Sequence, residues 1–336
     1  MTLLRPAYRL TLGEQIIDTK DEPKASTAVD LMVHLDMDTP ADGFTVVQGQ
    51  VGGAAPGPED DATIELGYTD TDFELVLTGR VVDVRPGFET KRIVGLSTED
   101  LLLRHHENET FEAMSAGDIV RELAARAGVD PDRIDDGVTL PAFVIDGRRS
   151  VGAHIRDLAG LSGFDTYVTQ EGALVFEEFA GQGTAHPLRF GEHVILIEVR
   201  RTRPAARTVE VWGESPGASR GTDSWAWLTK DFEAYRGTAG TGAPTMLVER
   251  SAIRTAEAAV SSATRTQVAV ERSEVTGSVR IQGRPSVHLG DVVRLEGFPL
   301  DDLDGNYQVR GVEHRITKAS GFVTDIGFRT VGSLEL

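Results

Sequence analysis

Alternation of apolar and polar residues dominates the first hundred positions of the chain. The stretch "AVDLMVHLDMD" places Val29, Leu31, Val33, Leu35 and Met37 on one face, as in a strand with one buried side. Similar alternation occurs in "YRLTL", "ATIELGY", "FELVLTGRVVDVR" and "TKRIVGLS". Residues 1–100 are therefore predicted to form a first small β-barrel.

The period of the pattern changes near residue 100. In "SAGDIVRELAARAG", Ser115 is a typical N-cap, apolar residues recur at helical spacing, and Gly128 is a typical stop. "SVGAHIRDLAGLSGF" repeats this helical pattern, and "DTYVTQEGALVF" predicts two short strands around Glu171-Gly172. Residues 101–180 are therefore predicted to form an α/β insert.

Strands return after the predicted insert. "HVILIEVRR" and "RTVEVWG" lie within residues 183–213, which we expect to complete the first barrel. An alanine-rich stretch predicts a helix over residues 251–267, and alternating segments follow it. Residues 214–336 are thus predicted to form a second β-barrel with a preceding helix. The fold class is mainly β with an α+β insert.

One late strand, "GNYQVRGVEHRI", changes its buried face halfway along. Tyr307 and Val309 hold odd positions, but after Gly311 the apolar side is held by Val312, His314 and Ile316. A glycine inside a strand commonly marks a bulge or a bend, and small closed barrels need such bends at their corners. We therefore expect Gly311 to lie at a barrel corner.

A similar switch occurs near Gly79 in "FELVLTGRVVDV". Superposing Gly79 on Gly311 aligns Leu75 with Tyr307, and Val82 with His314. Two unrelated strands that share a corner by chance are the simpler interpretation. A genuine repeat instead predicts two related small β-barrels, and three chains would then form a pseudo-sixfold trimeric ring.

Composition narrows the classes of function. The chain of 336 residues has 34 basic and 53 acidic residues, a net charge of −19, so we expect no specific nucleic acid partner. The absence of cysteine excludes disulfides, thiol catalysis and thiolate metal sites. No apolar run is long enough to span a membrane, and the first residues lack a secretory signal, so assembly in the cytoplasm is expected.

Candidate sites for chemistry are few. "HHENE" (105–109) lacks the spacing of a metal site, and "LDDLDGNY" does not place its acids as a calcium loop requires. The basic segment "RRTRPAAR" (200–207) is interpreted as an edge strand with a corner. Trp225 and Trp227 share one side of an extended segment and are a possible interface. We expect no catalytic residues, no cofactor and no metal.

Three late segments resemble the C-terminal signature of contractile-tail baseplate hub proteins. This group includes the phage late-control D proteins and the hub part of the valine-glycine-repeat spike proteins of type VI secretion. The segments are "RPSVHLGDVVRLEGF", "LDGNYQVRGVEHRI" and "SGFVTDIGFR". The matching residues are Gly290, Asp291, Gly305, Tyr307, Val309, His314, Gly321, Phe322 and Thr324.

The resemblance implies a structural role rather than an enzymatic one. Such a hub is a homotrimer that adapts the sixfold tail tube to the threefold spike, within a phage tail or a phage-like injection particle. The implied partners are a tail tube protein, a spike protein and, less directly, tape-measure and baseplate wedge proteins. Because the chain ends within eight residues of Phe328, the spike is expected to be a separate protein. The alternatives are a hub with an embedded peptidoglycan hydrolase and a standalone carbohydrate-binding module.

Overall fold

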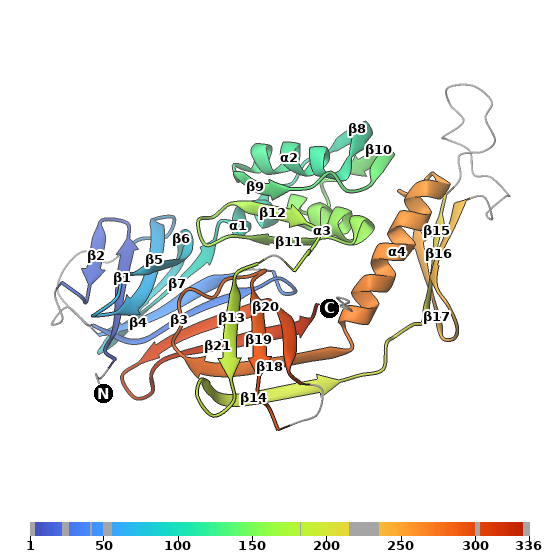
Figure 1. Ribbon diagram of the computed structural model, residues 1–336. Coiled ribbons are helices and arrows are strands. Elements are labelled where there is room, and N and C mark those ends of the chain that lie inside the picture. Colours follow the sequence, from blue (N-terminus) through green and yellow to red (C-terminus); the bar gives the residue numbers. More distant parts are fainter. Residues whose placement is uncertain are drawn as a thin grey trace.

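The computed structural model is mainly β and describes residues 4–21, 27–40, 42–49, 56–181, 183–214, 235–299 and 303–331. One long curled sheet forms the lower part of the molecule in Figure 1, and a small α/β unit lies above it. The predicted fold class, mainly β with an α+β insert, is confirmed. None of the helices in the described ranges is long and apolar enough to cross a membrane.

The curled sheet has 13 strands drawn from both ends of the chain. Its strands are β1 (Pro6–Leu12), β2 (Gln15–Asp18), β3 (Ala28–Asp36), β4 (Gly43–Gly49), β5 (Asp61–Tyr68), β6 (Glu74–Pro86) and β7 (Thr90–Ser97) in the first half, and β13 (Ala185–Arg189), β14 (Val194–Arg201), β18 (Val275–Gln282), β19 (Val292–Glu296), β20 (Gly305–Thr317) and β21 (Gly321–Thr330) in the second. The two halves join where β20 pairs with β3. They share one continuous hydrophobic core.

The two halves repeat one strand order. In the first half the neighbours run β3-β4-β7-β6-β5-β1, and in the second β14-β18-β21-β20-β19-β13. Corresponding strands also occur in the same order along the chain. The first four neighbouring pairs are antiparallel in both halves, whereas β1–β5 is antiparallel and β13–β19 is parallel. The sheet therefore contains one arrangement twice, with its first strand reversed in the second copy.

The insert consists of three helices and five short strands. They are α1 (Glu99–Arg104), β8 (Glu109–Ser115), α2 (Ala116–Ala127), β9 (Pro131–Ile134), β10 (Thr139–Ile145), α3 (Val151–Ser162), β11 (Asp165–Val168) and β12 (Leu174–Glu177). The Ser115 side chain accepts a hydrogen bond from the Asp118 N–H, and Gly128 ends α2 in the left-handed region with φ 78°. Gly172 turns the β11–β12 hairpin with φ 91°. The predicted caps and hairpin turn are confirmed.

A third unit packs with the insert rather than with the curled sheet. It comprises β15 (Thr208–Gly213), β16 (Arg236–Gly240), β17 (Thr245–Arg250) and α4 (Ala256–Arg272). Val209 and Val211 of β15 and Ala259 of α4 belong to the same hydrophobic core as α2 and α3. In Figure 1 this unit stands at one end of the molecule, and α4 runs from it toward the curled sheet.

Three expectations about this part of the chain differ from the structure. Within 183–213, β13 and β14 pair with β19 and β18 of the second half and do not complete the first half. Residues 208–213 and 236–272 form the third unit instead of part of a second barrel. The predicted helix over 251–267 occupies Ala256–Arg272, because the Thr255 side chain caps it by accepting from the Ala258 N–H.

Candidate functional site

The bend in β20 is the junction between the two halves. Val309 pairs with Phe328 and Gly311 with Gly327 on β21, so Arg310 is an extra residue in a β-bulge. Before the bulge one edge of β20 pairs with β19, and after it the same edge pairs with β3. Tyr307 and Val309 are buried before the bulge, and Val312 is buried after it. The buried face of β20 thus changes at the place where its pairing partner changes from β19 to β3.

The expected correspondence of Gly79 with Gly311 is four residues out of register. In β6 the extra residues are Val76 opposite β5 and Val82 opposite β7, while Gly79 pairs regularly with Ala62 and Ser97. Aligning the bulges places Val82 on Arg310 and Gly79 on Tyr307. A Cβ on Gly79 would lie 2.0 Å from the carbonyl oxygen of Leu96. Glycine is therefore required at position 79 for close strand approach and not for a bend.

Two further features support the corrected alignment. β3 carries an extra residue at Val29 and β14 at Ile195, each opposite the next strand of its half. The bulge turns Val29 outward, with 41% of it exposed, which corrects its expected place on the buried face. These two bulges and those at Val82 and Arg310 independently give one register for the repeat.

The repeat also preserves a pair of complementary side chains. Phe44 of β4 lies opposite Gly95 of β7, and the ring occupies the space that a Cβ on Gly95 would need. At the equivalent position of the second half, Gly277 of β18 lies opposite Phe328 of β21, with the two residue types exchanged. In each half, a phenylalanine ring therefore packs on a glycine of the neighbouring strand at the equivalent position.

The Gly290-Asp291 turn connects β13, β19 and the insert. Gly290 has φ 83°, and a Cβ there would lie 2.4 Å from the Tyr167 hydroxyl of β11. The Asp291 carboxylate is 2.9 Å from His186 Nε2 and accepts hydrogen bonds from the N–H groups of His288 and Thr184. This one carboxylate therefore fixes the turn and the start of β13.

The remaining signature residues make contacts within the curled sheet. His314 is fully buried, its Nδ1 lies 3.0 Å from the Thr324 hydroxyl, and its ring packs against Phe322. Burial, with a smaller contribution from His288, lowers the pKa of His314 to about 3, so its ring is neutral near pH 7. Gly321 turns the β20–β21 hairpin with φ 71°. The turn precedes Phe322, whose ring fills the core.

Two other signature residues belong to the start of β20. Gly305 is its first residue and pairs with Leu295 of β19. Tyr307 donates its hydroxyl to the Leu303 carbonyl oxygen at 2.9 Å and packs on the Phe328 ring. The signature thus marks residues that hold the bent hairpin in shape.

A buried charge cluster attaches the insert to the junction. Asp165 of β11 accepts hydrogen bonds from Arg310 at 2.5 Å, from Arg329 at 3.0 Å and from Gln308 at 2.8 Å. Its side chain is 10% exposed. Burial opposes its charge, but the guanidinium groups of Arg310 and Arg329 outweigh burial and hold the pKa of the Asp165 carboxyl below its ordinary value. Arg310 also pairs with Asp38, which follows β3.

Sequence reasoning missed this cluster. Arg310 is the bulge residue of β20, and 145 positions separate it from Asp165. The available signal was an arginine placed at the phase change of an alternating strand. The partner carboxylate could not be chosen from the sequence, because the chain contains 53 acidic residues.

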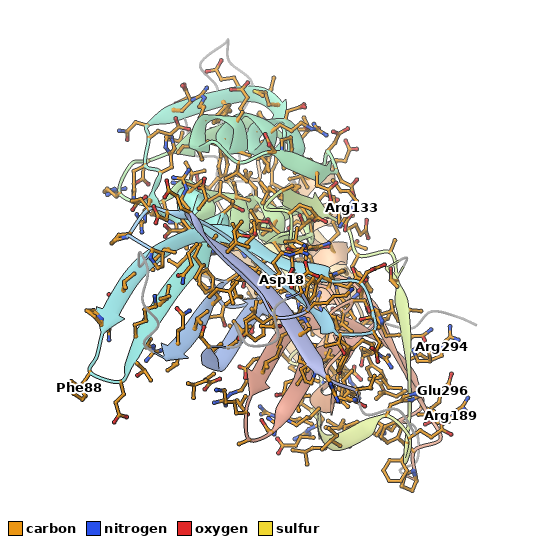
Figure 2. All side chains as sticks on the ribbon, turned by 90° about the vertical axis from the view of Figure 1, so that its left-hand side faces the viewer. Asp18, Phe88, Arg133, Arg189, Arg294 and Glu296 are labelled. Atoms are coloured by element: carbon orange, nitrogen blue, oxygen red, sulfur yellow. The ribbon has the colours of Figure 1, made fainter. Side chains whose placement is uncertain are left out.

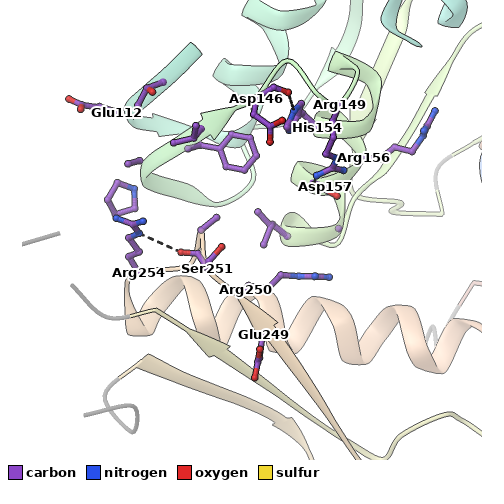
Figure 3. A pocket seen from close by; sticks show the side chains of 18 residues that line it. Glu112, Asp146, Arg149, His154, Arg156, Asp157, Glu249, Arg250, Ser251 and Arg254 are labelled. Carbon is purple, nitrogen blue, oxygen red and sulfur yellow. Dashed lines mark hydrogen bonds and ion pairs between the residues drawn. The ribbon is translucent and has the colours of Figure 1, made fainter. Parts of the chain in front are cut away.

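A hollow of about 760 Å³ lies between the insert and the β17–α4 connection (Figure 3). Arg149 pairs with Asp157 at 2.5 Å, and Asp146 pairs with Arg148 of its own segment. Figure 3 shows Glu112 directed away from the hollow. Two of the carboxylates that line the hollow, Asp146 and Asp157, are therefore paired with neighbouring arginines. Trp225 and Trp227, the predicted interface residues, lie outside the described residues.

The fold is similar to that of solved phage tail proteins. The 43 kDa tail protein of prophage MuSo2 from Shewanella oneidensis matches 96% of this chain and 98% of its own, with TM-score 0.72 and 13% identity. The tail protein from Neisseria meningitidis matches 97% of both chains, with TM-score 0.72 and 14% identity. The resemblance expected from the sequence is confirmed at the level of the fold.

The same fold occurs in a secretion system. An E. coli protein, described as a component of the type VI secretion system with structural similarity to T4 bacteriophage tail proteins, matches 96% of this chain and 77% of its own. Its TM-score is 0.60 at 10% identity. No protein-family model matches the sequence, and no curated protein matches it.

Proposed function

We propose that this chain is a structural baseplate hub of a contractile phage tail or of a phage-derived injection system. In this role three copies form a ring that adapts a sixfold tail tube to a threefold spike. The proposal is supported by the likeness to phage tail proteins over nearly the whole chain. The observation that carries it is the repeated strand order, because three chains with two similar halves offer six similar faces to a sixfold partner.

The proposed partners follow from this geometry. One end of the ring binds the tail tube protein, and the other binds a separate spike protein. The insert lies above the curled sheet and the third unit stands at one end of the molecule (Figure 1), which suits contact with baseplate wedge or tape-measure proteins. The chain has no enzymatic role in this proposal, and its signature glycines, His314 and Asp291 serve the fold.

Mass measurement of the purified chain, together with copurification, tests this function. Native mass spectrometry should give three times the mass of one chain, and coexpressed tube and spike proteins from the same gene cluster should copurify with it. A chain that stays monomeric at high concentration, alone and with these proteins, would contradict the proposal. Hydrolysis of peptidoglycan by the pure chain would favour the enzymatic alternative.

A further inference from the structure

The bent strand of the first half, β6, has an edge that corresponds to the edge of β20 that pairs with β3. In the second half, β20 pairs with β3 after its bulge. In the first half, β6 pairs with β5 only up to Arg80, and Val81 bonds to the Glu59 and Asp60 backbone. Among the described residues, no strand pairs with this edge of β6 beyond Val81. The equivalent place in the second half is occupied by seven paired residues of β3.

The repeat identifies the occupant. The strand equivalent to β3 is β14, and β14 is the terminal strand of the second half of the curled sheet. We propose that β14 of one copy of this chain pairs antiparallel with the β6 bend of the next copy. The contact repeats the junction already present inside each chain between β3 and β20. This inference rests on the proposed ring and names the surface through which it closes.

The register of the contact follows from the bulges. Inside the chain, Val312 lies opposite Leu35, and Glu313 opposite His34. Bulge alignment carries Val312 to Val84 and Glu313 to Arg85. The bulges at Val29 and Ile195 carry Leu35 to Arg201 and His34 to Arg200. In the new contact Val84 therefore lies opposite Arg201, Arg85 opposite Arg200, and Pro86 opposite Val199 of the neighbouring copy.

Backbone directions agree with this register. The Gly87 N–H donates to the Thr90 carbonyl oxygen across the β6–β7 hairpin, so alternation turns the polar groups of Val84 and Pro86 toward the outer edge. The Thr202 N–H donates to the Glu274 carbonyl oxygen, so the Val199 N–H points away from β18. Val199 can then donate to the Pro86 carbonyl oxygen. Pro86 has no N–H to donate in return, so this pair carries one hydrogen bond instead of two.

Exposed apolar side chains occur on both sides of the proposed contact. Phe88 is 97% exposed at the tip of the β6–β7 hairpin, and Figure 2 shows it projecting from the body of the molecule. On β14, Ile195 is 61% and Leu196 52% exposed. Continuing the register brings the Phe88 tip beside Leu196 and Ile197 of the next copy. Apolar surface on both partners is what a buried strand contact would cover.

Charges across the contact alternate in sign. Arg85 lies directly opposite Arg200, which is unfavourable by itself. The diagonal neighbours are of opposite charge, because Arg85 lies diagonal to Glu198, and Arg200 lies diagonal to Asp83. Asp83 already pairs with Arg85 within β6 at 2.5 Å. The four side chains can therefore form one network of alternating charge.

Disulfide trapping tests the register. The Arg85 and Arg200 positions face each other as a non-hydrogen-bonded pair, in which side chains approach closely enough for a disulfide. Arg85→Cys and Arg200→Cys are placed together in the full chain, which has no cysteine of its own. Under mild oxidation most chains should be linked into a covalent species of three chains. Non-reducing electrophoresis measures it, and reduction should return it to single chains.

Two matched variants control the experiment. Arg85→Cys with Val199→Cys shifts one thiol to the opposite face of β14 and should not link copies. His34→Cys with Glu313→Cys occupies the equivalent pair inside one chain and should close a disulfide without any gain in mass. Together these controls distinguish linking that requires the proposed register from linking by random collision of exposed thiols.

The outcomes distinguish this inference from the proposed function. A native trimer that the Arg85–Arg200 pair does not link, or that the shifted pair links equally well, overturns the strand contact and leaves the hub function standing. An open series of ever larger linked species overturns ring closure. A chain that is monomeric in native mass spectrometry overturns both.

Discussion

At the scale of single residues, Asp165 of the insert makes ion pairs with two arginines of the curled sheet. Its carboxylate neutralises Arg310 and Arg329 at the place where β20 changes neighbour. Removing one partner from a buried ion pair leaves an uncompensated charge, whereas an exposed pair contributes little. The link between insert and sheet therefore combines one buried acid with the apolar contacts of Tyr167 and Val175.

Asp165→Asn should lower the free energy of unfolding by about 3–5 kcal/mol, because buried Arg329 loses its counter-ion and buried Arg310 keeps only the exposed Asp38. The matched control is Asp325→Asn on β21, whose carboxylate pairs with the exposed Arg280 at 2.8 Å. That change should cost about 1 kcal/mol or less. Urea unfolding at pH 7 compares them. Equal losses for both variants would show that the cluster does not anchor the insert.

His314 should make stability depend on pH in a defined direction. Its pKa is about 3 in the folded chain and about 6.5 when unfolded, so between these values the unfolded state binds the extra proton. Stability from this group is therefore lost as pH falls from 7 toward 3. The loss between pH 7 and pH 5 should be about 2 kcal/mol.

The measurement is the difference between the parent and His314→Gln in urea unfolding at pH 7 and pH 5. Buried Asp42 also titrates, because burial raises its pKa to about 8, and its effect on stability has the opposite sign. The contribution of Asp42 is the same in both proteins and cancels in the difference. The variant should lose about 2 kcal/mol less than the parent over this interval. An unchanged pH dependence would mean that His314 is not buried as a neutral ring.

At the scale of elements, sequence reasoning succeeded where local chemistry decides. The caps of α2 at Ser115 and Gly128 were predictable because a side-chain oxygen and a left-handed residue act within one turn. The phase change in β20 was visible because its apolar residues change parity within one segment. The pairing partners of β13 and β14 were predicted wrongly, because alternation shows that a strand has a buried face and does not show which strand lies beside it.

The bulges explain the other errors. Val29 reads as one more apolar residue on the buried face of its strand, but the extra residue in β3 turns it outward. Gly79 attracts attention as a glycine in a strand, although the extra residue lies at Val82. A bulge is set by the neighbouring strand as much as by its own sequence, so its exact place could not be derived from one segment.

The two glycines of the bent strands should respond differently to alanine. A Cβ on Gly79 would clash with the Leu96 carbonyl oxygen at 2.0 Å, whereas a Cβ on Gly311 would meet its nearest atoms at 3.5 Å. Gly79→Ala should therefore cost about 1–3 kcal/mol of unfolding free energy. Gly311→Ala should stay within about 0.5 kcal/mol of the parent. Thermal or urea unfolding ranks them, and the reverse order would refute the assigned registers.

At the scale of the whole molecule, the curled sheet is an open arrangement with a repeated plan. Its last strand, β14, and the bent end of β6 are edges of the kind that invite pairing with another chain. A head-to-tail contact satisfies these edges in a closed ring or extends without limit as a filament. The net charge of −19 per chain predicts that the assembly repels other acidic surfaces, including nucleic acid phosphates.

The most direct test of the central claim is a reconstruction of the purified assembly by electron cryomicroscopy without imposed symmetry. The account predicts a closed ring of three chains in which six similar half-sheets alternate around the axis. At each boundary between chains, β14 should lie beside the β6 bend, as β3 lies beside β20 within a chain. A single chain, an open filament, or a ring in which β14 and the β6 bend face solvent would contradict the account.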